Sequence, residues 1–119
     1  MKLLLLILLL IDPVNDLDKI ARINAAKKEA EKAYLAKNYD IARDGYLYLR
    51  DSLGVNDDKL LLNLANAQFL SKDSVNAQQA YNNLRESSNK TIASLAEQQS
   101  DRSRQRRTGG TLNETKGCP

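Results

Sequence analysis

Few side chains in this 119-residue chain could carry out catalysis or bind a transition metal. Histidine is absent and Cys118 is the only cysteine, so the commonest general base and the commonest soft metal ligands are missing. Acidic pairs occur at Asp57-Asp58 and at Asp40 with Asp44, where helix capping or surface exposure explains them. No nucleophile, base and orienting group lie at plausible spacing. We therefore expect no enzyme, no metal site and no cofactor.

The clearest pattern in the chain is an internal repeat with a period of 35 residues. When the two copies are laid over each other, small residues match small ones and large residues match large ones. The matched pairs are Ala30 with Ala65, Tyr34 with Phe69, Ala42 with Ala77, Tyr46 with Tyr81, and Leu49 with Leu84. Self-similarity at this period is typical of stacked helical hairpins.

Apolar residues recur at helical spacing in five segments separated by short polar turns. The expected helices run from Asn15 or Asp16 to about 37, and over about 40–53, 58–71, 74–87 and 90–99. Leu17, Ile20 and Ala30 are counted in the apolar stripe of the first of these helices. This pattern predicts an all-α domain over residues 12–99, built as two hairpins and the first helix of a truncated third.

The segment Leu62-Asn63-Leu64-Ala65-Asn66-Ala67-Gln68, followed by a Lys-Asp turn, resembles the first helix of the tetratricopeptide repeat (TPR). The resemblance covers about residues 24–99 and implies a TPR-like helical solenoid. More loosely, the order of the segments looks like that of the TPR proteins of bacterial aerotolerance operons: an apolar N-terminal segment, then a charged helix, then such repeats.

The resemblance implies a concave groove lined by the first helix of each hairpin, where an extended peptide or a partner's helix would lie. Carried over position by position, the candidate groove residues are Lys27, Glu31, Tyr34, Lys59, Leu62, Asn66 and Phe69. The implied function is a non-catalytic scaffold that binds another protein, with no small-molecule substrate.

Several of these residues also fit a purely structural role. Tyr34 and Phe69 can be core filler, Lys27 and Glu31 can be a solvated intrahelical pair, and Asn66 can belong to the framework of the repeat. A clamp for a terminal carboxylate is disfavoured, because Glu31 would repel the ligand.

Lys2 is followed by nine aliphatic residues, Leu3 to Ile11, which match the core of a signal peptide. As a helix they rise about 13–14 Å, against about 30 Å of membrane hydrocarbon. Asp12-Pro13 follows, no small-x-small cleavage site is present, and we expect this dipeptide to separate residues 1–11 from the domain. We expect an exported or membrane-associated, periplasm-facing protein, with a cytoplasmic location as the alternative.

Residues 100–119 interrupt the apolar pattern and carry the whole excess of positive charge, because residues 1–99 hold 13 basic and 13 acidic residues. We expect a polar, disordered tail, and we hypothesise a frameshifted or truncated third repeat. Its arginines give the alternative function, contact with nucleic acid, although no aromatic residues are interleaved with them. Apolar surface left uncovered where the third repeat stops could drive self-association.

Overall fold

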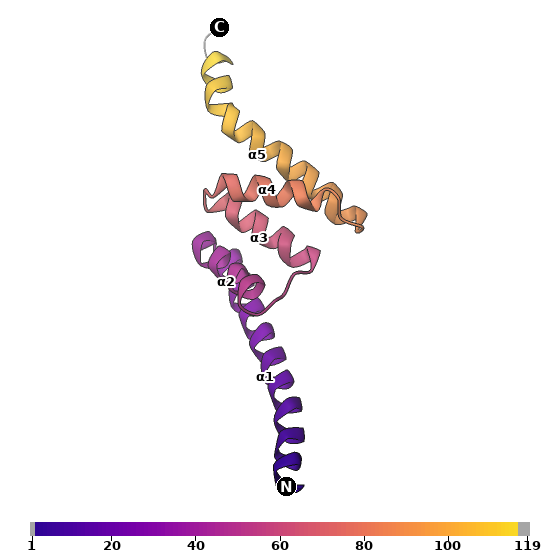
Figure 1. The fold of residues 1–119 in the computed structure, drawn as a ribbon. Helices are drawn as coiled ribbons and strands as arrows, with labels where there is room; N and C mark the ends of the chain where they lie inside the picture. The colour runs from indigo at the N-terminus through magenta and orange to yellow at the C-terminus, as the bar shows by residue number, and fades with distance from the viewer. Residues whose placement is uncertain (1, 117–119) are drawn as a thin grey trace.

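The computed structural model describes the backbone of residues 2–116 and the side chains of residues 16–106. This described part contains five α-helices and no strand, which confirms the all-α expectation (Figure 1). The helices are α1 (Lys2–Leu35), α2 (Tyr39–Asp51), α3 (Asp58–Leu70), α4 (Ser74–Leu84) and α5 (Lys90–Lys116). Cys118 lies outside the described residues.

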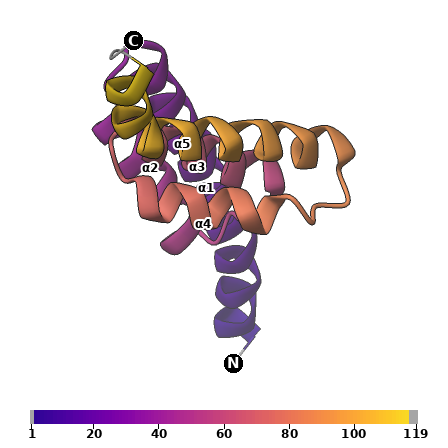
Figure 2. The ribbon, with the colours of Figure 1, turned by 90° about the horizontal axis from the view of Figure 1, so that it is seen from above.

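The helices pack as two hairpins in series, α1 with α2 and α3 with α4, followed by α5. Helix α2 packs against α3, and α5 packs against α4 and α3, so each layer contacts the next (Figures 1 and 2). A polar contact also joins the hairpins, because Arg43 Nη1 of α2 donates a hydrogen bond to Ser71 Oγ at 3.2 Å. In such a stack of hairpins, each layer of helices contacts only the layers next to it.

The two hairpins turn in the same way, at positions 35 residues apart. Lys37 and Lys72 both have left-handed backbone conformations, with φ of 65° and 69°. The backbone hydrogen bonds that close the two turns also match: Asn38 N–H to Ala33 O at 2.9 Å, and Asp73 N–H to Gln68 O at 2.8 Å. The internal repeat seen in the sequence is therefore also a repeat of backbone structure.

The matched small and large positions form the core, as the overlay predicts. The buried matched residues are Ala30, Ala65, Ala42, Ala77, Tyr46, Tyr81, Leu49 and Leu84. One core cluster lies among α1, α2 and α3, and a second lies among α3, α4 and α5. Helix α3 contributes to both clusters, which explains why its sequence is apolar nearly all round.

The helix start expected at Asn15 or Asp16 is wrong, because α1 is continuous from Lys2 through Asp12-Pro13 to Leu35. Proline removes one backbone hydrogen bond from a helix without always ending it. Leu17 and Ile20 are 67% and 54% exposed, although the sequence pattern placed them in the apolar stripe. Ile23 is the first residue of α1 that packs against the first core cluster, and the N-terminal half of α1 extends away from the other helices. None of the described side chains therefore covers Leu17 and Ile20 (Figure 1).

The prediction that the fifth helix stops near Gln99 is also wrong, because α5 continues to Lys116. Ser100 and Ser103 are buried, and Gln78 Nε2 of α4 donates to Ser100 Oγ at 2.5 Å. Together with Ala96 they form a small-residue stripe at i, i+4 and i+7, the spacing of one helix face. Residues 100–106 are thus part of the packed structure and not a disordered tail.

Within the part of the chain that the structure describes, no helix combines the length and the apolarity needed to cross a membrane.

Candidate functional site

A small hollow opens between α1 and α3, and we call it the α1–α3 hollow. Its volume is about 160 Å³. Its lining residues are Lys27 and Glu31 of α1, Tyr46 of α2, and Asp57, Lys59, Leu60 and Asn63 at the start of α3. The structure thus brings together three of the seven predicted groove residues, Lys27, Glu31 and Lys59.

The α1–α3 hollow mixes both signs of charge around a tyrosine. Burial, and then the nearby charge of Glu31, raise the pKa of Tyr46 above its ordinary value of 10.0. Its hydroxyl therefore keeps its proton at neutral pH and can donate a hydrogen bond. Asp57 is already engaged as the N-cap of α3, where its carboxylate accepts from the Leu60 N–H at 3.2 Å. The side chains of the hollow suit hydrogen bonds and ion pairs with a peptide.

Tyr34 does not line this hollow. It is half-buried, packs against the first core cluster and meets Tyr39 edge to face, with ring centroids 5.5 Å apart. Burial raises the pKa of Tyr34 above its ordinary value, and the neighbouring Tyr39 raises it further. These contacts make the ring part of the packing around the first turn.

Asn66 and Leu62 lie on α3 at its contact with α4 and α5. The Tyr81 hydroxyl donates a hydrogen bond to Asn66 Oδ1 at 2.7 Å, which connects α4 to α3. Burial raises the pKa of Tyr81 well above its ordinary value. Leu62 is buried in the second core cluster. The contacts of both residues match the framework role that the sequence left open for Asn66.

Phe69 is approached by a side chain of α5. The Arg106 guanidinium carbon lies 5.2 Å from the centre of the Phe69 ring, the geometry of a cation–π contact. Sequence reasoning missed this contact, because it assigned Arg106 to a tail with no place in the fold. The four remaining candidates, Tyr34, Leu62, Asn66 and Phe69, thus all make packing or side-chain contacts away from the α1–α3 hollow.

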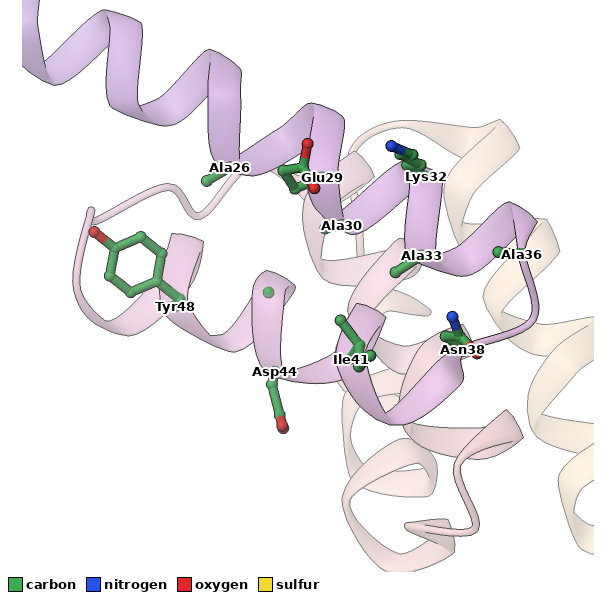
Figure 3. Close-up of a pocket in the computed structure, with 11 residues that line it drawn as sticks. Ala26, Glu29, Ala30, Lys32, Ala33, Ala36, Asn38, Ile41, Asp44 and Tyr48 are labelled. Atoms are coloured by element: carbon green, nitrogen blue, oxygen red, sulfur yellow. The ribbon is translucent and has the colours of Figure 1, made fainter.

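A larger hollow, which the sequence did not reveal, lies between α1 and α2, and we call it the α1–α2 hollow (Figure 3). Its volume is about 550 Å³. A row of alanines on α1 faces Ile41 and Tyr48 on α2 across it, and Asp44 lines its edge with the carboxylate directed away from α1 (Figure 3). The available signal was the pair of apolar residues Ile41 and Tyr48, seven apart on a helix and both exposed.

No group of three or more His, Cys, Asp or Glu side chains that could hold a metal ion occurs among the described residues. A comparison with known proteins gave no match to a family model, to a curated protein or to a solved structure.

Proposed function

We propose that this chain is a non-catalytic interaction protein that binds an extended peptide or a partner's helix in the α1–α3 hollow. One observation carries the proposal: Lys27 and Glu31 of α1 and Lys59 and Asn63 of α3 line one hollow together with Tyr46. These residues come from three different helices, so the packing of the two hairpins creates the hollow.

The side chains of the hollow supply complementary kinds of hydrogen bond. The two lysines donate, Glu31 accepts, and Asn63 can do both. A peptide offers both donors and acceptors along its backbone, so this mixture suits it better than a purely acidic or basic lining would. The mixed charges favour specificity and orientation of the partner more than raw affinity.

The same proposal extends to fold family and location. The matched turns and buried pairs support a TPR-like solenoid with a third repeat that begins in α5. The aliphatic run from Leu3 to Ile11 supports export or attachment at a membrane surface, with the partner at the same surface. The side chains of this run lie outside those that the structure describes.

The test uses peptides selected against the full-length protein from a random display library. We expect Lys27→Glu to weaken the selected peptides by about tenfold or more, because it places a third acidic group in the α1–α3 hollow. Lys28→Glu is the matched control, since Lys28 is the next residue, is also exposed, makes the same change in net charge and does not line the hollow.

Fluorescence anisotropy with labelled peptides measures the difference. Lys59→Glu should repeat the effect of Lys27→Glu from the other wall of the hollow. Equal binding by the Lys27, Lys28 and Lys59 variants would show that peptides bind elsewhere, and the proposed site would be wrong.

A further inference from the structure

A further hollow, of about 420 Å³, lies along α3 and α4, and we call it the α3–α4 hollow. Leu47 and Arg50 of α2 form one wall of it, and most of its lining side chains are polar. The charge of Arg50 is already matched, because its Nε lies 2.8 Å from a carboxylate oxygen of Asp51. The α3–α4 hollow shares no lining residue with the α1–α3 hollow or the α1–α2 hollow.

Two acidic residues lie at the two ends of the α3–α4 hollow. Asp58 is the first residue of α3, and Asp73 directly precedes α4. The Asp73 N–H donates to the Gln68 backbone oxygen at 2.8 Å, so Asp73 lies beside the last turn of α3. Because the helix rises about 15 Å from Asp58 to Gln68, the two acidic residues are about 15 Å apart along the hollow.

Neither of these carboxylates forms an ion pair within the described part of the chain. Asp58 accepts a hydrogen bond from the Ser87 hydroxyl. Asp73 accepts from Asn76 Nδ2, at 3.1 and 3.0 Å to its two oxygens. Both donors are neutral, so negative charge without a cationic partner remains at each end of the hollow. Such a charge distribution favours a ligand with two separated positive charges.

Side-chain amides line the hollow between its two acidic ends. Gln79 and Asn83 are exposed on α4, and their side chains form no hydrogen bond with a described residue. An amide side chain both donates and accepts hydrogen bonds. The pair can therefore bond to the N–H and C=O groups of a peptide backbone that lies along the hollow.

The floor of the hollow contains a buried acceptor. Gln68 lines the hollow and is only 4% exposed, and its Oε1 accepts no hydrogen bond from the described residues. A buried acceptor without a partner is costly, and a donor that reaches it removes this cost. Ligands rich in N–H donors, such as peptides with basic side chains, meet this requirement.

We propose that the α3–α4 hollow binds an extended peptide that carries two basic residues four positions apart. In an extended chain, such residues point to the same side and lie about 13 Å apart, which brings one to Asp58 and the other to Asp73. Gln79 and Asn83 bond to the backbone between them, and the aliphatic stem of a basic side chain packs on Leu61. This site is additional to the α1–α3 hollow and does not depend on the function proposed there.

The experiment is a titration of the full ¹⁵N-labelled chain with synthetic nine-residue peptides, followed by nuclear magnetic resonance. The first peptide has lysines at its third and seventh positions and alanine or serine elsewhere. The second has the lysines at its third and fifth positions, and the third has glutamates in place of the lysines of the first. We expect the first peptide to shift the side-chain amide signals of Gln79 and Asn83, with a Kd about threefold or more below that of the second. The glutamate peptide should cause no shift.

Two variants test the acidic ends. Asp58→Asn and Asp73→Asn remove the charge but keep an oxygen that can accept from Ser87 and Asn76. Each should raise the Kd of the first peptide by about two- to fivefold, the effect expected of an exposed ion pair. Asp101→Asn is the matched control, because Asp101 is exposed on α5, lies outside the hollow and undergoes the same change in charge. It should leave the Kd unchanged.

Equal Kd values for the two lysine peptides would overturn the proposal. So would an unchanged Kd in the Asp58 and Asp73 variants, or the absence of any shift with the first peptide. A shift of the Asn63 amide in place of Gln79 and Asn83 would put the peptide in the α1–α3 hollow. That result would overturn this proposal and leave the function proposed for the α1–α3 hollow standing.

Discussion

The hydrogen bond between Tyr81 and Asn66 allows a sharp test of how the second hairpin is held together. The Tyr81 ring is fully buried, and its hydroxyl donates to Asn66 Oδ1 at 2.7 Å. We predict that Tyr81→Phe destabilises the protein, because it removes the donor and leaves the Asn66 carbonyl without this partner while keeping the ring in place.

The size of the effect follows from the environment of the bond. A neutral hydrogen bond contributes about 1 kcal/mol net, and a fully buried acceptor left unpaired costs about 1–3 kcal/mol. Asn66 is half-buried, so water can reach part of it and the lower end applies. We expect a loss of about 1–1.5 kcal/mol, which corresponds to several degrees in Tm for a domain of this size.

Urea unfolding followed by circular dichroism measures this loss. Tyr46→Phe is the matched control in the first hairpin, because it keeps a buried ring at the equivalent position. The hydroxyl that it removes borders the α1–α3 hollow and does not bond to Asn66. We expect the loss for Tyr46→Phe to be smaller. A Tyr81→Phe variant as stable as the unchanged protein would refute the assigned hydrogen bond.

Three further predictions concern a helix cap, the end of α5 and the pH dependence of stability. Asp57→Ala should cost about 1 kcal/mol in urea unfolding, whereas Asp73→Ala should cost less, because the Asp73 side chain makes no capping hydrogen bond. Deletion of residues 100–119 should lower Tm, since it uncovers the part of α4 that Ser100 contacts; an unchanged Tm would contradict the packing of this segment. Burial raises the pKa of Tyr81 in the folded state, so stability is full below pH 10 and should fall as pH rises above it. Tyr81→Phe should reduce that alkaline loss, and an identical pH profile would contradict its cause.

The two hairpins could be predicted from the sequence because their packing depends on residue size at fixed spacing. Ala42 and Ala77 match, Tyr46 and Tyr81 match, and all four are buried. A helix face needs small residues where a neighbour comes close and large ones where a gap must be filled. Such a pattern can be read without knowing which helices touch.

Other features depend on neighbours that the sequence does not show. Ser100 and Ser103 look polar in a search for apolar spacing, yet they are small enough to be buried against a neighbouring helix. Leu17 continues an apolar stripe but lies where α1 has no neighbour in the described structure.

The candidate site was predicted only in part, because some of its residues contact neighbours that the sequence does not show. Lys27, Glu31 and Lys59 do line one hollow, whose position follows from the stacking of the hairpins. The burial of Leu62 and the contact of Phe69 with Arg106 depend on the path of α5, which the apolar pattern placed incorrectly. The α1–α2 hollow depends on how closely α1 and α2 approach each other, which the sequence does not show.

The most direct test is whether the two hairpins nest in solution, because the α1–α3 hollow exists only where they pack together. Leu49 of α2 and Leu64 of α3 are buried in the same core cluster. In a methyl-labelled sample of the full chain, nuclear Overhauser effects should connect α2 with α3 through these leucines. Methyl groups of α2 and α3 that show no contact between the hairpins would contradict the account.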